Sequence, residues 1–390
     1  MSDTASVRLP HVIIAGVTTR PFAVSAARAG YRVTAIDAFG DLDLRAVANV
    51  ILPHPKPGQV YGPLQAAAAG TSVSAELAAY TSNFENYPAA VTRLAERRHL
   101  LGNAATTLAR VRNPIEVMRV LRRHGLVCPE SRNRPPARSS FRVAWLLKPR
   151  RSGGGHGVVR WSPGQVVPPS MYVQQRIAGT PGSIAFAADG SSAVLLGFSR
   201  QLVGESHLGA GRFRYCGSIL GTLGEPLFGH QEELLERAGA IATVLAREFR
   251  LRGLNGVDFI ARNGVPYPIE VNPRYSASME LVERAHSVSM FEIHTRSCRG
   301  ELPAPLPPGR KLQGKAIVFA RQDTVVRDLH HLARSNWLAD VPPPGQYIPQ
   351  GRPICTVFAQ ARQPEACRRL LLRRARLVYR AMKAARKQAA

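Results

Sequence analysis

The sequence predicts an α/β protein with more than one lobe, and three observations lead to this fold class. The chain has 390 residues, which is too many for one ordinary core and suits two or three packed lobes. Residues 11–37 follow the order strand, helix, strand that begins an open α/β sheet. Farther along, paired strands with short turns alternate with amphipathic helices, which is typical of mixed α/β lobes.

The first predicted element is the apolar run 11–15, and residues 31–37 predict a second strand. Pro21 and Gly30 are typical of the start and the end of the helix between them. The G-x-G-x-x-G spacing of dinucleotide-binding loops is absent after the first strand. Asp37 stands at the end of the second strand, where a ribose-binding acid would stand in such a site.

The rest of the chain continues the alternation of helices and strands. Asn113 followed by proline predicts the start of a helix that ends near Gly125, and a Pro/Arg/Ser-rich connection follows it. Apolar residues recur on one side of a predicted helix at 231–251. The remaining predicted elements are strands at 143–148, 157–161, 171–177, 315–320 and 354–359, a hairpin at 255–271 and a helix from about 365.

The composition excludes several classes of protein. Apolar residues make up 45% of the chain and charged residues 20%, which indicates a globular protein. No apolar run reaches the ~18 residues that a membrane span needs, and residues 1–10 lack the apolar core of a secretory signal. The 5 cysteines are widely spaced without a C-x-x-C pair, which favours reduced thiols over disulfides or zinc ligands. We therefore expect a cytoplasmic location.

Positive charge is the unusual bulk feature. The net charge is +26 and the isoelectric point is near 11.1, so the surface attracts polyanions. Nucleic acid, an anionic membrane and an acidic substrate all fit, and a compositional bias toward arginine is the alternative. The basic residues of the last helix are expected to surround it as a solvated or docking tail. They are Arg368, Arg369, Arg373, Arg374, Arg376, Arg380, Lys383, Arg386 and Lys387.

The hairpin at 255–271 carries the strongest local signal. A three-residue turn centred on Asn263 and Gly264 places Asp258 directly opposite Glu270, and Asn272 points to the same face. Opposed carboxylates repel unless a cation lies between them, and Mg²⁺ takes oxygen ligands of this kind. The hairpin therefore predicts a magnesium site. The alternative is a surface hairpin with solvated acids.

A glycine cluster lies between the strands 143–148 and 157–161. Its sequence is Lys-Pro-Arg-Arg-Ser-Gly-Gly-Gly-His-Gly, from Lys148 to Gly157. Backbone N–H groups of such a loop can cradle phosphates, although no G-K-[ST] follows and the next element is a strand. A flexible hairpin is the alternative. Lys148, at the end of the first strand, is expected to reach the phosphates because it has little else to pair with.

These motifs occur in the order of the ATP-grasp superfamily, which the sequence resembles over about 110–300. The resemblance implies a Rossmann-like pre-ATP-grasp domain at 1–105, an ATP-grasp domain at 106–305 with a hinge near 175–180, and a small C-terminal lobe with the basic helix at 306–390. The segments 83–87, 101–103, 213–218 and 339–355 make the chain most similar to predicted ATP-dependent carboligases related to biotin carboxylase and tyramine–glutamate ligase.

The resemblance also implies roles for individual residues. The nucleotide contacts are Lys148, Ser152, Gly153, Gly154, Gly155, His156, Gly157, Gln175, Arg176, Ile177 and Arg112. Asp258, Glu270 and Asn272 bind Mg²⁺, for which Mn²⁺ can substitute, while Arg274 and Arg200 steady the transferred phosphoryl group. The chain departs from the family at 174–175, where two glutamines replace the usual glutamate, and at Arg112, which replaces a lysine.

The implied reaction is ATP-dependent amide formation between a small-molecule carboxylate and an amine through an acyl phosphate. Related members suggest addition of glutamate or another amino acid to a one-carbon cofactor precursor of the tetrahydromethanopterin or methanofuran type, and the charge suggests an acidic substrate. Two alternatives stay open: a carboxylase that acts through carboxyphosphate, and a basic nucleic-acid-binding protein without catalytic activity. No nucleic-acid module is recognised in the sequence. The oligomeric state is open, with a homodimer as one alternative.

Overall fold

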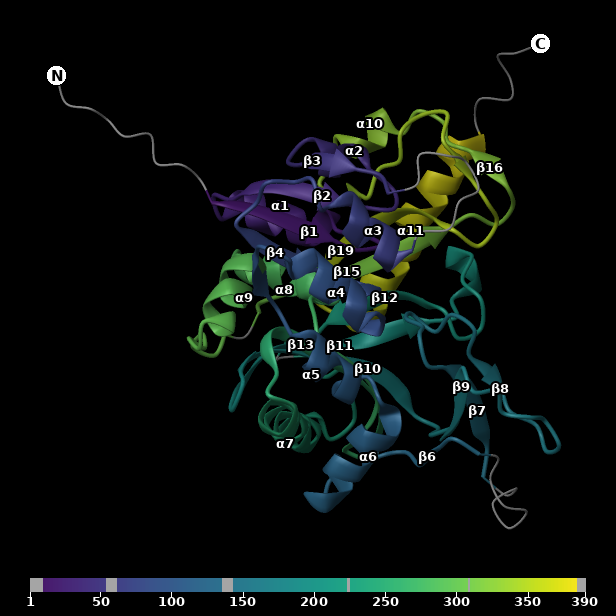
Figure 1. Cartoon of the computed structure of the whole chain (residues 1–390). Coiled ribbons are helices and arrows are strands. Elements are labelled where there is room, and N and C mark those ends of the chain that lie inside the picture. The colour runs from purple at the N-terminus through teal and green to yellow at the C-terminus, as the bar shows by residue number, and fades with distance from the viewer. Residues whose placement is uncertain (1–9, 54–61, 135–142, 223–224, 308, 384–390) are drawn as a thin grey trace.

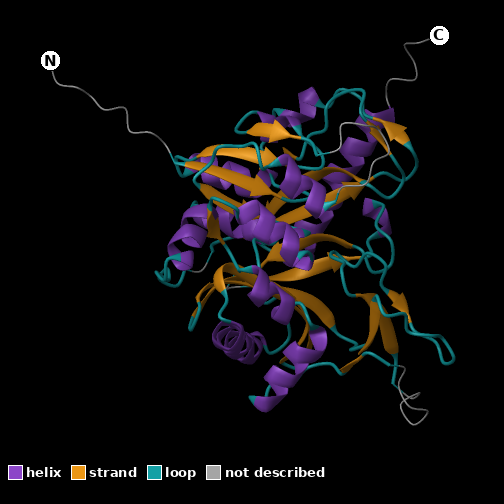
Figure 2. Ribbon diagram, in the orientation of Figure 1, coloured by secondary structure: helices purple, strands orange, loops and turns teal. Residues whose placement is uncertain are grey.

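The computed structural model describes residues 10–53, 62–134, 143–222, 225–307 and 309–383 (Figure 1). Three features of the sequence analysis lie wholly or partly outside these ranges. They are the N-terminal segment 1–10, the predicted Pro/Arg/Ser-rich connection, and the last basic residues Arg386 and Lys387. Helices and strands alternate along the chain and build a layered molecule (Figure 2). Both the parallel and the antiparallel sheets described below confirm the predicted α/β class.

The N-terminal lobe is a parallel sheet with strand order β3-β2-β1-β4-β5. β1 is buried along its whole length, because helices on both faces of a parallel sheet exclude water from it. The carboxylate of Asp37 accepts bonds from the backbone N–H groups of Thr19, Phe39 and Gly40, so this acid braces the lobe. The strands are β1 (His11–Ala15), β2 (Arg32–Ile36), β3 (Asn49–Ile51), β4 (Leu77–Tyr80) and β5 (His99–Leu101).

An eight-stranded sheet with order β14-β13-β10-β11-β12-β15-β19-β17 forms the centre of the molecule. Three of its inner strands, β10, β11 and β12, were not predicted, and β15 and β19 join them to the C-terminal region through antiparallel ladders. The strands are β10 (Thr180–Asp189), β11 (Ala193–Val203), β12 (Tyr215–Leu220), β13 (Arg252–Arg262), β14 (Val265–Asn272), β15 (Leu312–Phe319), β17 (Leu338–Ala339) and β19 (Pro353–Ala361).

A smaller four-stranded sheet with order β6-β9-β7-β8 stands to one side of the central sheet and carries the glycine cluster (Figure 1). Its strands are β6 (Ser131–Arg132), β7 (Trp145–Pro149), β8 (Val159–Arg160) and β9 (Met171–Gln175), and a separate pair consists of β16 (Thr324–Val325) and β18 (Tyr347–Ile348). The predicted strands 143–148 and 171–177 correspond to β7 and β9.

Helices cover the sheets and connect their strands. The predicted helices 113–125 and 231–251 correspond to α6 and α7, whose apolar faces pack into the main core. No described helix is both long and apolar enough to cross a membrane. The α-helices are α1 (Arg20–Arg28), α2 (Leu42–Arg45), α3 (Pro63–Ala69), α4 (Pro88–Ala95), α5 (Ala105–Val111), α6 (Pro114–Arg123), α7 (Gln231–Phe249), α8 (Met279–His286), α9 (Met290–Cys298), α10 (His330–Ala333) and α11 (Pro364–Lys383).

The C-terminal helix α11 is part of the core and not a solvated tail. Its residues Cys367, Leu371, Ala375 and Val378 are buried against the central sheet. The expectation that exposed basic residues surround this helix on all sides is wrong. Two of them are held by other elements, since Arg368 pairs with Glu205 and Arg374 with the carbonyl of Phe358. The exposed cations share one face: Arg369, Arg373, Arg376, Arg380 and Lys383.

Candidate active site

A large cavity of about 1770 Å³ lies where the N-terminal lobe, the small sheet and the central sheet meet. This volume exceeds the ~300–1,000 Å³ of an ordinary ligand site, so a nucleotide and a second substrate fit together. Most of the predicted site residues line it, and among the described residues Gly157 and Arg200 do not. The lining residues from the prediction are Arg112, Lys148, Ser152, Gly153, Gly154, Gly155, His156, Gln175, Arg176, Ile177, Asp258, Glu270, Asn272 and Arg274.

The β13–β14 hairpin places Asp258 opposite Glu270, as predicted, but it reaches that register by another route. The turn has two residues, Asn263 and Gly264, since Arg262 pairs with Val265. Both turn residues have positive φ, which the tight Asn-Gly turn requires. A bulge at Ile269 then shifts the pairing by one residue and restores the opposition of the two acids. The predicted three-residue turn is therefore wrong.

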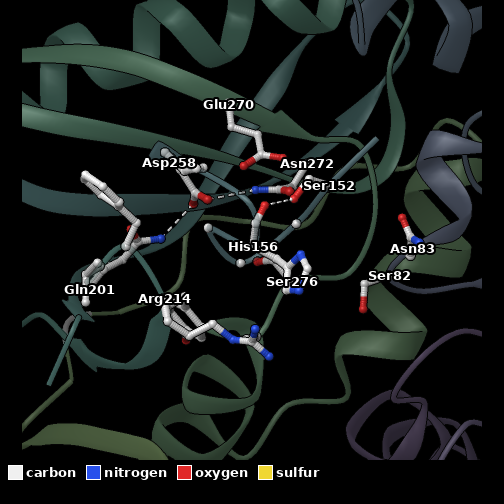
Figure 3. A pocket seen from close by; sticks show the side chains of 18 of the residues that line it. Ser82, Asn83, Ser152, His156, Gln201, Arg214, Asp258, Glu270, Asn272 and Ser276 are labelled. Atoms are coloured by element: carbon white, nitrogen blue, oxygen red, sulfur yellow. Dashed lines mark hydrogen bonds between the residues drawn. The ribbon is translucent and has the colours of Figure 1, made fainter. Parts of the chain in front are cut away.

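Asp258 is half-buried, and two side-chain amides donate hydrogen bonds to it. Its carboxylate accepts bonds from Gln201 Nε2 on β11 at 2.9 Å and from Asn272 Nδ2 at 3.1 Å. Figure 3 shows these side chains and Glu270 pointing toward one another. Burial, and then the charge of Glu270, raise the pKa of Asp258 to about 6. A cation between the two carboxylates would remove this repulsion.

Glu270 has the opposite electrostatic balance. Burial disfavours its charge, but Arg112 and Lys148 outweigh burial and hold the pKa of Glu270 below its ordinary value. Arg112 Nη1 donates to Glu270 Oε1 at 2.9 Å and to the carbonyl of Val271 at 2.7 Å. The same guanidinium donates to Ser152 O and to Asn86 Oδ1, so the protein already occupies it.

The donor set fits a hard divalent cation. Asp258 and Glu270 offer carboxylate oxygens from two adjacent strands, which is the chemistry that Mg²⁺ prefers. Asn272 Oδ1 is a third oxygen nearby, and it accepts a bond from Arg274 Nη2. The described residues contain no group of three or more His, Cys, Asp or Glu side chains that could hold a metal ion. Phosphate oxygens would therefore have to complete the shell, as they commonly do for Mg²⁺. A site of this kind holds its metal together with a nucleotide.

The glycine cluster forms a loop that packs beside the carboxylates and is docked on β12. Tyr215 N donates to Gly154 O at 3.0 Å, and a Cβ on Gly155 would lie 1.8 Å from the carbonyl of Phe213, so only glycine fits there. Ser152 Oγ donates to His156 O at 2.6 Å and closes the loop on itself. A Cβ at Gly153 would meet no heavy atom within 4 Å, which leaves room for a phosphate.

Lys148 lines the cavity but is already bonded. Its Nζ donates to Gln174 Oε1 at 3.0 Å and to the carbonyl of the bulged Ile269 at 3.1 Å. The expectation that Lys148 has little else to pair with is therefore wrong. Gln174 occupies the position at which the family usually has glutamate, and its neutral amide accepts one bond from this lysine. The ammonium is thus fixed between β9 and β14.

The two arginines predicted to steady the phosphoryl group differ in position. Arg274 lines the cavity and forms an ion pair with the buried Glu85 at 2.8 Å, while its Nη2 also donates to Asn272 Oδ1 at 3.1 Å. Arg200 points to the other face of β11 and pairs with Glu365 at 3.5 Å. Arg200 therefore does not lie where the prediction requires it. The next residue, Gln201, is the one that faces Asp258.

Comparisons with known proteins agree with this geometry. Residues 111–278 match the family described as ATP-grasp domain. An uncharacterized protein of Methanocaldococcus jannaschii is 27% identical over 112 residues, which is 29% of this chain and 27% of that protein. The chain thus spans about a quarter of the length of this curated relative.

Two solved structures are similar over nearly the whole chain. Biotin carboxylase from Campylobacter jejuni, in its complex with β,γ-ATP, has a TM-score of 0.71 at 12% identity and covers 95% of this chain and 91% of its own. L-amino acid ligase from Bacillus licheniformis has a TM-score of 0.66 at 15% identity, and the match covers 95% of this chain and 97% of the ligase chain. Residues 111–278 thus form an ATP-grasp domain, which contains the opposed carboxylates and the glycine loop, and the fold of the two solved structures extends over nearly the whole chain.

Proposed function

We propose that this protein is an ATP-dependent ligase that joins a carboxylate to an amine through an acyl phosphate. The observation that carries the proposal is the pair Asp258 and Glu270, opposed on adjacent strands in a cavity that also contains the glycine loop. The substrate carboxylate attacks the γ-phosphate of ATP and displaces ADP, which gives an acyl phosphate. The amine then attacks the acyl carbon and displaces phosphate, which gives the amide and releases a proton. The likeness to an L-amino acid ligase supports amide formation.

Different side chains of the cavity have different proposed roles. Asp258, Glu270 and Asn272 would hold Mg²⁺, or Mn²⁺ in its place, and the metal offsets phosphate charge when bound. The loop from Ser152 to Gly157 covers the phosphates and excludes water, which would otherwise hydrolyse the acyl phosphate. Arg274, held by Glu85, presents positive charge beside Asn272, where charge develops on the transferred group.

The finer assignment is addition of glutamate or another amino acid to a one-carbon cofactor precursor of the tetrahydromethanopterin or methanofuran type. It rests on the resemblance of the sequence to carboligases and on the net charge of +26, which favours acidic substrates. A carboxylase that acts through carboxyphosphate is the second candidate, and the likeness to a biotin carboxylase favours it. The two candidates differ in the group that ATP phosphorylates: an organic carboxylate in the ligase and bicarbonate in the carboxylase.

The test is release of ADP from Mg-ATP with a panel of cofactor precursors as carboxylates and amino acids as amines. We expect ADP release that depends on both the carboxylate and the amine, and we expect that bicarbonate does not replace the carboxylate. Asp258→Asn and Glu270→Gln should abolish it with the circular dichroism spectrum unchanged, and Glu236→Gln, an exposed acid of α7, is the matched control. ADP release that requires bicarbonate would favour the carboxylase. Near wild-type activity in either variant would contradict the assignment of Asp258 and Glu270 as metal ligands.

A further inference from the structure

Two arginines on the cavity wall are not used by the protein itself. Arg214 directly precedes β12, Arg352 directly precedes β19, and both line the cavity. Within the part of the chain that the structure describes, neither guanidinium has a hydrogen bond or an ion pair with a protein group. Arg214 Cζ lies 5.1 Å from the centre of the Phe319 ring, which supports the guanidinium from one side.

Four other cations of the cavity wall are in a different situation. Arg112 is bonded to Glu270, Arg274 to Glu85, and Lys315 Nζ to Glu280 Oε2 at 2.5 Å. Lys148 is held by an amide and a carbonyl. These groups are neutralised or fixed by the fold. Arg214 and Arg352 carry charge that the fold leaves available to a ligand.

The backbone brings the two arginines to the same end of β15. The carbonyl of Arg352 accepts a bond from Ala320 N at 2.8 Å, directly after Phe319, over whose ring Arg214 lies. Burial, and then the neighbouring charge of Arg352, lower the pKa of Arg214. Two like charges at one wall repel each other, and an anion between them would relieve this repulsion.

We propose that Arg214 and Arg352 bind a second anionic group of the substrate, a carboxylate or a phosphate that is separate from the carboxylate being activated. This inference rests on the proposed ligase function and names the substrate class of the same cavity. Planar guanidinium groups bind both anions through paired N–H donors. The substrate would therefore carry at least two acidic groups.

The position of Arg214 argues for substrate rather than nucleotide. Tyr215 N is bonded to the glycine loop at Gly154, but the Arg214 side chain extends over Phe319 on β15. In Figure 3 its guanidinium points away from Asp258, Glu270 and Asn272. The phosphates of ATP would lie between those carboxylates and the glycine loop. The remaining space beside β15 is then the place for the acidic end of the second ligand.

The experiment uses the full chain with saturating ADP and Mg²⁺, and the probes are glutarate and inorganic phosphate, titrated by calorimetry. We expect Arg214→Gln and Arg352→Gln each to weaken binding of one probe by about tenfold or more, with ADP affinity within about twofold of wild type. Arg214→Lys, which keeps the charge, should recover part of the affinity. Arg373→Gln on the exposed face of α11 is the control of equal charge change.

The probe that loses affinity identifies the anion, since glutarate reports a carboxylate subsite and inorganic phosphate a phosphate subsite. Three results would overturn the proposal: wild type binds neither probe, the variants bind both probes as wild type does, or ADP affinity falls as much as probe affinity. The last result would assign the arginines to the nucleotide. This experiment measures binding, so its outcome is independent of turnover. If amine-dependent ADP release is absent, the ligase function is contradicted, while the binding data still test the role of the two arginines.

Discussion

Arg112 Nη1 donates to Glu270 Oε1 at 2.9 Å while its Nη2 donates to Ser152 O at 3.2 Å. One guanidinium therefore connects the β13–β14 hairpin to the glycine loop. The family usually has a lysine here, and a single ammonium is poorly suited to span both partners in the fixed geometry of a guanidinium fork. Arg112 thus acts as a positioning residue for both halves of the phosphate site.

We expect Arg112→Lys to lower kcat/KM for ATP by roughly tenfold or more, because hydrogen bonds to charged groups contribute ~1.5–3 kcal/mol each. Amide hydrogen exchange across 152–157 should become faster, since the loop loses its anchor. Arg110→Lys, on the solvent side of the neighbouring helix α5, is the control. Unchanged exchange in the loop would show that Arg112 does not position it.

The pH dependence of metal binding follows from Asp258. Its folded-state pKa is about 6, above the ordinary value, because burial and Glu270 disfavour the charge. Without metal, ionised Asp258 lowers the free energy of unfolding, and this loss is fully present above a pH of about 6. The loss is relieved as the pH falls from the folded-state pKa toward the ordinary pKa of an aspartate. Mg²⁺ needs the ionised form, so its affinity should fall roughly tenfold per pH unit below the pKa.

Calorimetric Mg²⁺ titrations at about pH 5 and about pH 7.5, with ADP present, measure this effect. Thermal unfolding without metal at the same pH values, compared between wild type and Asp258→Asn, isolates the contribution of this carboxyl from other buried acids. The wild type should gain stability relative to the variant as pH falls. An equal pH response of the two proteins would contradict the raised pKa of Asp258.

Lys148→Met should weaken nucleotide binding and also lower stability. The substitution leaves the carbonyl of Ile269 and the amide oxygen of Gln174 without their donor, and an unsatisfied buried polar group costs ~1–3 kcal/mol. We expect a lower melting temperature together with a roughly tenfold higher Kd for ATP. Lys148→Arg is the comparison that keeps the charge. A variant that loses only stability would show that Lys148 does not contact the nucleotide.

Ionic strength should suppress kcat/KM for an acidic substrate, because salt screens the attraction beyond a Debye length of ~10 Å. Truncation after Pro364 cannot test the role of the basic helix, since it would remove the core residues Cys367 and Leu371. Replacing Arg369, Arg373, Arg376 and Arg380 by glutamine removes exposed charge and should leave the melting temperature nearly unchanged. A salt profile that stays steep in this variant places the attraction at the cavity, and a flat wild-type profile contradicts electrostatic steering.

The local elements of the site were predictable from the sequence. The Asn263–Gly264 turn, the alternation of Asp258 with apolar neighbours and the glycine cluster after Lys148 are short-range patterns, and such patterns determine turns, strand faces and loops. The opposition of Asp258 and Glu270 was predicted correctly even though the turn was one residue too long in the prediction. The bulge at Ile269 compensated for that residue, and nothing in the sequence indicated it.

The contacts between distant segments were decided by the tertiary structure alone. Gln201 reaches Asp258 because β10, which the sequence analysis missed, pairs with both β11 and β13 in the central sheet. Glu85, which follows β4 of the N-terminal lobe, reaches Arg274, which follows β14. Alternation along a strand says which residues share a face but not which face meets the cavity, so Arg200 was chosen in place of its neighbour. The sequence by itself determined which side chains and which glycine loop make up the proposed phosphate site, because these are short-range patterns. Packing of the sheets determined which charges are neutralised and which, like Arg214, stay available for a ligand.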